Sequence, residues 1–339
     1  MTGSRGAEEQ AAPLQGIKVV EFTHMVMGPT AGVILGDLGA DVIKVEPLKG
    51  DNTRRLKGSG AGYFPMYNRN KRSIALDLKH PKGRDVARQL IQSADIVLEN
   101  FRTGTMAKLG LDYESLKADH PGLIYCSLKG FLSGPYENRV ALDEVTQMMG
   151  GLAYMTGLPD RPLRAGSSVI DITGGMFGVI AILSALHRRR ETGEGSHVTS
   201  ALFETTAFLV GQHMAQQAVS GDAPPPMSVR QSAWAVYDIF ELNSGERLFV
   251  GIVSDSLWQR LCEEFGLTDW AADVTLASNA GRVAARDNLL PAIRELFAPL
   301  SLAELSERLD RAGLPFSPIN TPGDLFDDPH LTASGGLLP

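Results

Sequence analysis

The feature that most constrains the fold of this 339-residue chain is the alternation of β-rich runs with helical stretches between residues 17 and 131. Runs rich in β-branched and other apolar residues lie at residues 17–22, 41–46, 73–78, 95–101 and 123–131. Helical stretches separate them, at residues 28–38 and from Pro81 onward, where proline suits the first turn of a helix. Because strands that alternate with helices run parallel, this order predicts an α/β fold, a parallel sheet with helices on its faces.

The chain becomes mainly helical beyond Asp143, with helices expected at residues 145–156, 173–190 and 203–220. The stretch from Met176 to Leu186 is apolar nearly all round, which predicts a buried helix, although polar interruptions leave the apolar stretches short of a membrane span. Arg188, Arg189 and Arg190 follow it and complement the negative end of a helix. This basic run therefore has a structural explanation.

A second domain is expected after a proline-rich linker, because a chain of this length usually divides in two. Strands are expected at residues 236–242, 247–253 and 316–319, and helices at residues 256–265, 285–297 and 302–312. The predicted organisation is a disordered tail at 1–12, a large Rossmann-like domain at 13–220, a linker at 221–233, a small α/β domain at 234–327, and a final segment at 328–339.

Composition excludes several classes of protein. The net charge of −7 argues against nucleic acid as a partner, since phosphate binding needs a basic face. Cys126 and Cys262 lie far apart and show neither disulfide nor metal-ligand spacing, and the histidines show no metal spacing either. The polar N-terminus carries no apolar signal core. We therefore expect a cytoplasmic protein with no membrane partner and no metal.

Asp171 is the most informative single residue. It follows a small neutral loop, precedes a long apolar helix, and has no arginine or lysine within six residues. The pattern alone favours a helix N-cap, because aspartate readily accepts the free amides of a first turn. The functional interpretation is a nucleophilic carboxylate at the positive end of a helix, beside Gly174 and Gly175, which would let a substrate approach the backbone.

The ends of the predicted strands suggest a site for a phosphorylated ligand. Lys79, Arg102 and Lys108 could form a local cationic site for phosphates, or simply a solvated basic rim. Glu46 ends the second strand, where a dinucleotide-binding protein places an acid, but the glycine fingerprint is missing, so nicotinamide binding is not favoured. His24 has no acid or nucleophile near it in sequence and is read as a packed or capping histidine rather than a general base.

Several sequence blocks in a fixed order resemble the class III coenzyme A transferases, the family of formyl-CoA transferase, carnitine CoA-transferase and the acyl-CoA racemases. The blocks begin at Pro13, Leu35, Asn68, Asp95, Arg189 and Asp328 and read PLQGIKVVEFTHMVMGP, LGDLGADVIKVE, NRNKRSIALD, DIVLENF, RRETGEG and DPHL. The resemblance implies a Rossmann-like large domain, a small α/β domain, and a homodimer of interlocked rings. It also implies acyl-CoA and a small carboxylic acid as substrates, with no tightly bound cofactor.

The resemblance assigns roles to individual residues. Asp171 falls at the catalytic aspartate, which forms an anhydride and then a thioester with CoA, and backbone amides from Thr173 to Gly175 would be the oxyanion donors. The implied coenzyme A contacts are Val26, Met27, Leu76, Asp77, Leu78, Lys79, Asn100, Phe101, Arg102, Lys108, Val140, Leu142 and Asp143. The arginine that often follows the second strand is Pro47 here, and Lys49, Arg54 or Arg55 could replace its charge.

The chain departs from the family pattern in ways that narrow the function. Leu142 occupies the position of the racemase histidine, and leucine cannot transfer a proton. The glycine-rich loop that formyl-CoA transferase carries in its small domain has no counterpart, so formyl and oxalyl groups are not favoured. Residues 328–339 look like the start of a shortened return segment, which puts the closed ring in doubt.

The predicted function is transfer of CoA from an acyl-CoA donor to a free carboxylic acid through covalent intermediates on Asp171. The acceptor could be a dicarboxylic acid whose second carboxylate binds Arg164 or Arg230. The alternatives are an acyl-CoA racemase or epimerase and a catalytically silent CoA-binding homologue. A nicotinamide enzyme is a weaker alternative.

Overall fold

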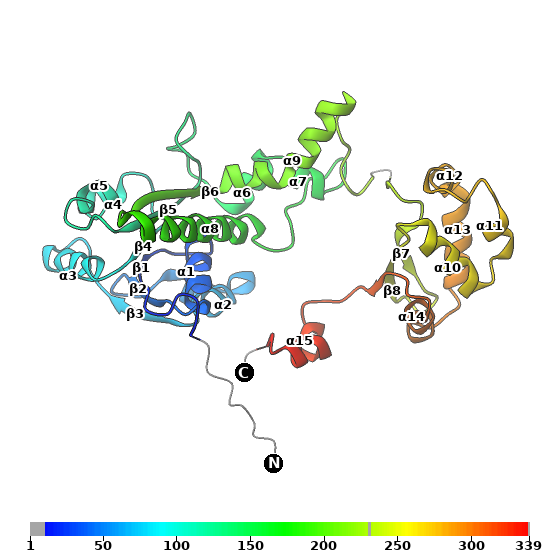
Figure 1. Cartoon of the computed structure of the whole chain (residues 1–339), viewed down its shortest axis with the longest axis horizontal. Coiled ribbons are helices and arrows are strands. Elements are labelled where there is room, and N and C mark those ends of the chain that lie inside the picture. The colour runs from blue at the N-terminus through cyan, green and yellow to red at the C-terminus, as the bar shows by residue number, and fades with distance from the viewer. Residues whose placement is uncertain (1–10, 230–231, 338–339) are drawn as a thin grey trace, which may run out of the picture. The chain divides into compact units, whose positions relative to one another are not determined.

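The computed structural model describes residues 11–229 and 232–337, and the chain forms two compact units, Met1–Arg230 and Gln231–Pro339 (Figure 1). Arg230 and most of the expected N-terminal tail lie outside the described residues. The first unit holds the large sheet and most of the sequence blocks singled out above. The second unit holds a smaller sheet, so each is described by itself.

The described residues of the first unit form a six-stranded parallel sheet, as the alternating pattern predicts. Its strand order is β3-β2-β1-β4-β5-β6. The strands are β1 (Lys18–Phe22), β2 (Asp41–Glu46), β3 (Lys71–Ala75), β4 (Ile96–Glu99), β5 (Ile124–Lys129) and β6 (Ser196–Ala201). The prediction missed β6, because this edge strand reads Ser-His-Val-Thr-Ser-Ala and lacks a buried apolar run. Strand β3 also begins and ends earlier than residues 73–78.

Helices cover both faces of the large sheet, which makes it doubly wound (Figure 1). Alternate side chains of each strand point to opposite faces, so Val19 packs beneath α1 (Met27–Asp37) and α8 (Val169–Thr192). Its neighbour Val20 packs on the other face. That face carries α3 (Pro81–Gln92), α4 (Thr105–Leu109) and α5 (Tyr113–Leu116).

The remaining helices of the unit are α2 (Tyr63–Tyr67), α6 (Asp143–Met149), α7 (Leu152–Thr156) and α9 (Leu202–Ser220), with short 3-10 turns at Asn52–Arg55 and Gly58–Gly60. The single helix expected at 145–156 is in fact two, because Gly151 adopts a φ of 81° between them. The helix expected to begin at residue 173 begins four residues earlier, at Val169. This earlier start changes the role of Asp171.

Gly174 and Gly175 allow α8 to cross α1 closely. A Cβ added to Gly175 would lie 2.7 Å from the Met27 carbonyl oxygen, and one added to Gly174 would lie 2.8 Å from Met27 Cε. Both glycines are buried. The prediction that they admit a substrate to the backbone is therefore wrong, because another helix occupies that space.

By length and composition, α8 is the one helix in the described residues that could cross a membrane, contrary to the expectation that the apolar stretches fall short. It packs against α1, β5, β6 and α9 within the first unit. One face of α8 is that of a core helix in a globular unit, but Met176, Ile180 and Leu183 are exposed, so the prediction of a buried helix holds for that face only.

The second unit contains an antiparallel sheet of β7 (Tyr237–Glu241), β8 (Arg247–Gly251) and β9 (Phe316–Pro318). Its helices are α10 (Asp255–Phe265), α11 (Thr268–Ala272), α12 (Asn279–Ala284), α13 (Arg286–Phe297) and α14 (Leu302–Arg311). Trp258, Phe240 and Phe297 are fully buried in its core. A 3-10 turn (Asp324–Asp327) and α15 (Pro329–Ser334) follow, and Asp328 caps α15 by accepting the Leu331 amide at 2.8 Å.

Candidate active site

A cavity of about 270 Å³ lies beyond the carboxyl ends of β1 and β5, where α1 and α8 begin. In an open parallel sheet this edge is where ligands bind. The cavity is lined by residues from both helix starts, including Met27 and Asp171, and from the start of α6 and the residue before it, Asp143 and Leu142. It therefore brings the predicted nucleophile together with several predicted coenzyme A contacts.

Asp171 is the third residue of α8 and not its N-cap. The cap position is Ser168, whose side chain makes no capping hydrogen bond. The amides of Ile170 and Asp171 instead donate to Oδ2 of Asp143, at 2.9 and 3.1 Å. Asp143 thus performs the capping that the sequence suggested for Asp171, from 28 residues away. Among the described residues, no hydrogen bond engages the Asp171 carboxylate.

The capping carboxylate is itself held firmly. Asp143 is buried, and its Oδ1 accepts a 2.6 Å hydrogen bond from Nε2 of Gln147. The amide oxygen of Gln147 in turn accepts the backbone N–H of Ala165 at 2.8 Å. Arg164 adds a looser ion pair, 3.6 Å from Nη2 to Oδ1 of Asp143. Three close donors therefore fix Asp143 beneath the first turn of α8.

The surroundings raise the pKa of Asp171 to about 7. Burial is the main cause, because it disfavours the charged form, and the negative charge of Asp143 acts in the same direction. The positive charge of Arg164 opposes them. Burial and the charge of Asp171 together also raise the pKa of Tyr67. A carboxylate with this pKa is more basic, and so a better nucleophile, than an ordinary exposed aspartate.

The loop between β1 and α1 contributes His24 and Met25 to the lining of the same cavity. Met25 adopts a φ of 63°, a strained conformation for a non-glycine residue. In the part of the chain that the structure describes, the amides of Met25 and Val26 have no acceptor. By contrast, Thr173, Gly174 and Gly175 follow the first turn of α8, where amides bond to carbonyls four residues earlier. The prediction that these three supply oxyanion donors is therefore wrong.

A neighbouring cavity of about 390 Å³ gathers further predicted coenzyme A contacts, namely Asn100, Phe101, Arg102, Val140 and Leu142. Asn100, Leu142 and His24 line both cavities, so the two are adjacent. The His24 amide donates to Oδ1 of Asn100 at 3.0 Å, and Nδ2 of Asn100 donates to the His24 carbonyl oxygen at 2.8 Å. His24 is exposed, so it is not the packed histidine expected from the sequence, and partial desolvation lowers the pKa of its imidazole, which favours the neutral form.

Six predicted contacts line neither of these cavities, and one of them, Val26, is buried. Leu76 and Leu78 pack against the core on the α3 face, and Oδ1 of Asp77 accepts the Lys79 amide at 2.9 Å. Lys79 and Lys108 are exposed, as is Arg102. The phosphate-binding role of these three cations remains a prediction.

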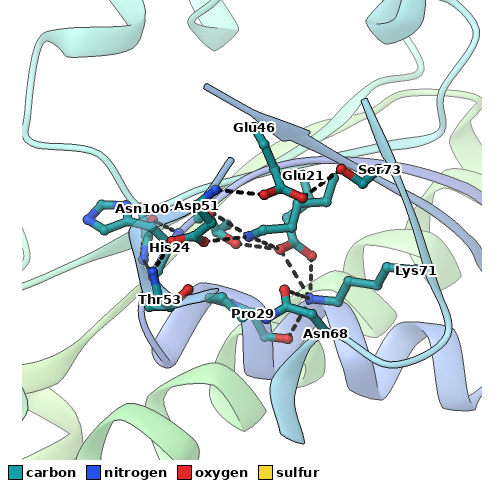
Figure 2. A network of polar contacts seen from close by, with 12 residues as sticks. Glu21, His24, Pro29, Glu46, Asp51, Thr53, Asn68, Lys71, Ser73 and Asn100 are labelled. Carbon is teal, nitrogen blue, oxygen red and sulfur yellow. Dashed lines mark hydrogen bonds and ion pairs between the residues drawn. The ribbon is translucent and has the colours of Figure 1, made fainter. Parts of the chain in front are cut away.

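Sequence reasoning missed a buried network of charges beside the site (Figure 2). Lys44 is 1% exposed, and its Nζ lies 3.3 Å from Oε1 of Glu21 and 3.2 Å from Oδ2 of Asp51. Lys71 Nζ lies 2.8 Å from Oε2 of Glu21 and donates to the Pro29 carbonyl oxygen at 2.9 Å. The network ties β1, β2 and β3 to the start of α1. The available signal was a charged residue inside apolar strand runs.

Arg54, one of the three cations that could replace the missing arginine, is already engaged. Arg54 donates to both carboxylate oxygens of Glu46, at 2.8 and 2.6 Å, and Ser73 donates to the same carboxylate at 2.6 Å. The pKa of Glu46 is lowered to about 2, chiefly by the hydrogen bonds from Arg54. Arg54 is therefore a structural partner of β2.

Comparison with known proteins identifies the family. The family model described as CoA-transferase family III matches residues 14–339. Succinate–glutarate CoA-transferase of Agrobacterium fabrum is 36% identical over 336 residues, covering 95% of this chain and 84% of that protein. Succinyl-CoA:mesaconate CoA-transferase of Haloarcula hispanica is 32% identical over 332 residues, with 94% and 83% covered.

The comparison with solved structures leads to the same family. The crystal structure of a CAIB/BAIF family protein from Brucella suis has 40% sequence identity and a TM-score of 0.85, and the match covers 96% of this chain and 89% of that one. The chain therefore belongs to CoA-transferase family III. It is a class III CoA-transferase with an α/β fold, and acyl-CoA is its substrate.

Proposed function

We propose that this enzyme transfers CoA from an acyl-CoA donor to a free carboxylic acid through covalent intermediates on Asp171. One observation carries the proposal: the Asp171 carboxylate lines a cavity, without a hydrogen bond among the described residues and with its pKa raised to about 7. A structural aspartate at a helix start would normally accept the free amides there. In this chain Asp143 accepts them, which leaves Asp171 available for chemistry.

The chemistry balances without any further reactant. An oxygen of Asp171 attacks the donor thioester carbon, the C–S bond breaks, and CoA leaves as its thiolate. The thiolate attacks the aspartyl carbon of the resulting anhydride and releases the donor acid, which leaves an aspartyl-CoA thioester. The acceptor carboxylate attacks this thioester to form a second anhydride and a thiolate. The thiolate then attacks the acceptor's carbonyl carbon, which gives the new acyl-CoA and frees Asp171.

The loop before α1 supplies the donors that this route needs. Each attack creates a negatively charged oxygen, which is stabilised by fixed N–H groups in a site that excludes water. The amides of Met25 and Val26, unpaired in the described residues, lie at the positive end of α1. Met25 itself lines the cavity of Asp171. The strained φ of Met25 supports this role, since strain at a loop is typical of functional sites.

The racemase alternative lacks its second base. Racemisation needs two proton-transfer groups on opposite sides of the substrate carbon. Leu142, which the family resemblance places at the position of the racemase histidine, lines the cavity beside Asp171 and is 59% exposed. A racemase would exchange the α-hydrogen of an acyl-CoA with solvent deuterium, and we expect no such exchange here.

The test is to trap the activated aspartate. The protein is mixed with acetyl-CoA or succinyl-CoA, quenched in hydroxylamine, digested and examined by mass spectrometry. We expect a hydroxamate on Asp171, and none on the buried Asp143, which serves as the control within the same sample. Asp171→Asn should abolish both the hydroxamate and CoA transfer while the far-ultraviolet circular dichroism is retained. Full transfer activity in this variant would disprove the proposal.

A further inference from the structure

The cavity of Asp171 contains a cation that its neighbours leave largely unused. Of the guanidinium nitrogens of Arg164, only Nε makes a hydrogen bond within the described residues, to the Ala165 carbonyl oxygen at 3.2 Å. Nη2 lies 3.6 Å from Asp143 and Nη1 lies 3.8 Å from Oε2 of Glu144, both beyond hydrogen-bonding distance. Arginine presents five N–H donors in a planar fork, so four of them remain available.

The other basic groups lining this cavity are already neutralised. Lys129 Nζ lies 2.6 Å from Oε1 of Glu99 and donates to the Phe101 carbonyl oxygen at 2.7 Å. The backbone of His24 is hydrogen-bonded to Asn100, and desolvation lowers the pKa of its imidazole, so it carries little charge at neutral pH. Among the described residues that line the cavity, Arg164 is therefore the cation with free donors.

Arg164 is not needed to hold Asp143. The two oxygens of Asp143 already accept three closer hydrogen bonds, from Gln147 and from the amides of Ile170 and Asp171. The Glu144 carboxylate is 57% exposed and is well solvated without an arginine. A guanidinium that shares only long contacts with two carboxylates can accept a third one in bidentate geometry.

Arg164 and Asp171 are close but not in contact. The positive charge of Arg164 lowers the pKa of Asp171, so the two groups interact electrostatically. No ion pair within 4.0 Å joins them in the described part of the chain. A molecule with one carboxylate at Asp171 and a second at Arg164 would span this separation.

We infer that Arg164 binds the second carboxylate of a dicarboxylic acid while the first reacts at Asp171, so that the enzyme selects short dicarboxylic acids over monocarboxylic acids. This inference rests on the proposed function of Asp171. The role of Arg164 is in specificity, since its side chain would contact the end of the substrate that does not react. Arg230, the other arginine considered for this role, lies outside the described residues.

The experiment compares succinate with succinamate, in which a neutral amide replaces one carboxylate. We expect the wild-type enzyme to favour succinate by about 10- to 150-fold in kcat/KM, the range of a lost charge-assisted hydrogen bond. In Arg164→Gln the preference should fall below about threefold, chiefly because the rate with succinate drops. Arg164→Lys, which keeps the charge but not the fork, should retain part of the preference. Assays at pH 8.5 keep Asp171 ionised in every variant.

Arg161→Gln is the matched control, because Arg161 is exposed and lies three residues away in the same loop. It should leave the preference unchanged. The inference is overturned if wild-type enzyme shows no preference, if Arg164→Gln keeps it, or if that variant loses succinate and succinamate equally. The last result would mean that Arg164 serves the reacting carboxylate or the placement of Asp171.

A binding measurement separates this inference from the proposed function. Calorimetric titration of the protein with succinate and succinamate, in free CoA and without acyl-CoA, involves no turnover. Succinate binding that depends on Arg164, in an enzyme that forms no Asp171 intermediate, would refute the proposed function and support the inference. Transfer through Asp171 with equal binding of both acids, in the wild type and in Arg164→Gln alike, would refute the inference alone.

Discussion

Replacing Asp171 by asparagine should stabilise the large unit at alkaline pH, because the folded protein holds this carboxylate where its charge is unfavourable. Its pKa is about 7 when folded, against about 3.9 for an aspartate in an unfolded chain. Below about pH 4 the group is protonated in both states and costs nothing. Between about pH 4 and pH 7 the unfolded chain releases its proton while the folded chain keeps it, so the folded state loses stability over this range, and the loss is complete above about pH 7.

The size of the effect follows from the two pKa values. At about 1.36 kcal/mol per pH unit, the difference between 3.9 and 7 corresponds to about 4 kcal/mol at pH 8 and above. Asp171 is only partly buried, and solvent screening reduces this upper bound, so we expect a gain of about 2 kcal/mol for Asp171→Asn at pH 8.5. At pH 4 the gain should be close to zero.

The assay must report on the unit that contains Asp171. All three tryptophans, Trp234, Trp258 and Trp270, lie in the second unit, so their fluorescence follows the wrong part of the molecule. Hydrogen exchange of peptides from β5 and α8 in increasing urea, read by mass spectrometry, reports the stability of the first unit. Tryptophan fluorescence then serves as an internal control that should not change.

The control variant is Asp222→Asn, since Asp222 is exposed just beyond the end of α9. It should alter stability by less than about 0.5 kcal/mol at either pH. An equal gain from Asp171→Asn at pH 4 and at pH 8.5 would refute the electrostatic reasoning, because a packing effect does not titrate. No gain at pH 8.5 would show that the folded protein tolerates the charge.

The remaining predictions concern the surroundings of the site. The kcat/KM for acyl-CoA should rise with pH through about 7 as Asp171 ionises, and Asp143→Asn should move this rise to lower pH by about one pH unit, as pH–rate profiles would show. Gly175→Ala should lower stability by about 1–3 kcal/mol in denaturant titration, because its Cβ would lie 2.7 Å from the Met27 carbonyl oxygen. Lys44→Met should cost about 3–5 kcal/mol in the same titration, because it leaves buried carboxylates without their cation; a loss below about 1 kcal/mol would contradict this.

The parallel sheet could be predicted because each of its inner strands, and each helix between them, is specified by residues that are adjacent in the sequence. Each inner strand is a short β-branched run, and the helices between the strands follow from proline and apolar periodicity. The edge strand β6 could not be found in this way, since its side chains are half polar. Asp171 could be singled out by its neighbours in sequence. The capping of α8, however, was predicted for Asp171 and belongs to Asp143, because the hydrogen bonds from α8 to Asp143 join positions 27 and 28 residues apart.

The glycine pair illustrates the same limit. A sequence shows that Gly174 and Gly175 lack side chains, but not what fills the space beside them, which is Met27 of α1. The unused donors of Arg164 are likewise visible only once the partners of Asp143 are known. Contacts between distant segments decide each of these cases, so one sequence carries no local signal for them.

The two helices that begin at the cavity differ in what becomes of the backbone amides at their N-terminal ends. Asp143 takes up the first amides of α8, so these donors do not stabilise the charge of Asp171, and its pKa stays near 7. The amides that precede α1 remain unpaired in the described residues and can stabilise an oxyanion. A substrate carboxylate, with a pKa near 4, is a better leaving group than Asp171. In the proposed route this preference favours the first thiolate attack, which expels the donor acid and leaves CoA on Asp171. In the last step Asp171 must itself leave the acceptor anhydride, so there the N–H donors before α1 must favour attack at the acceptor's carbonyl carbon instead.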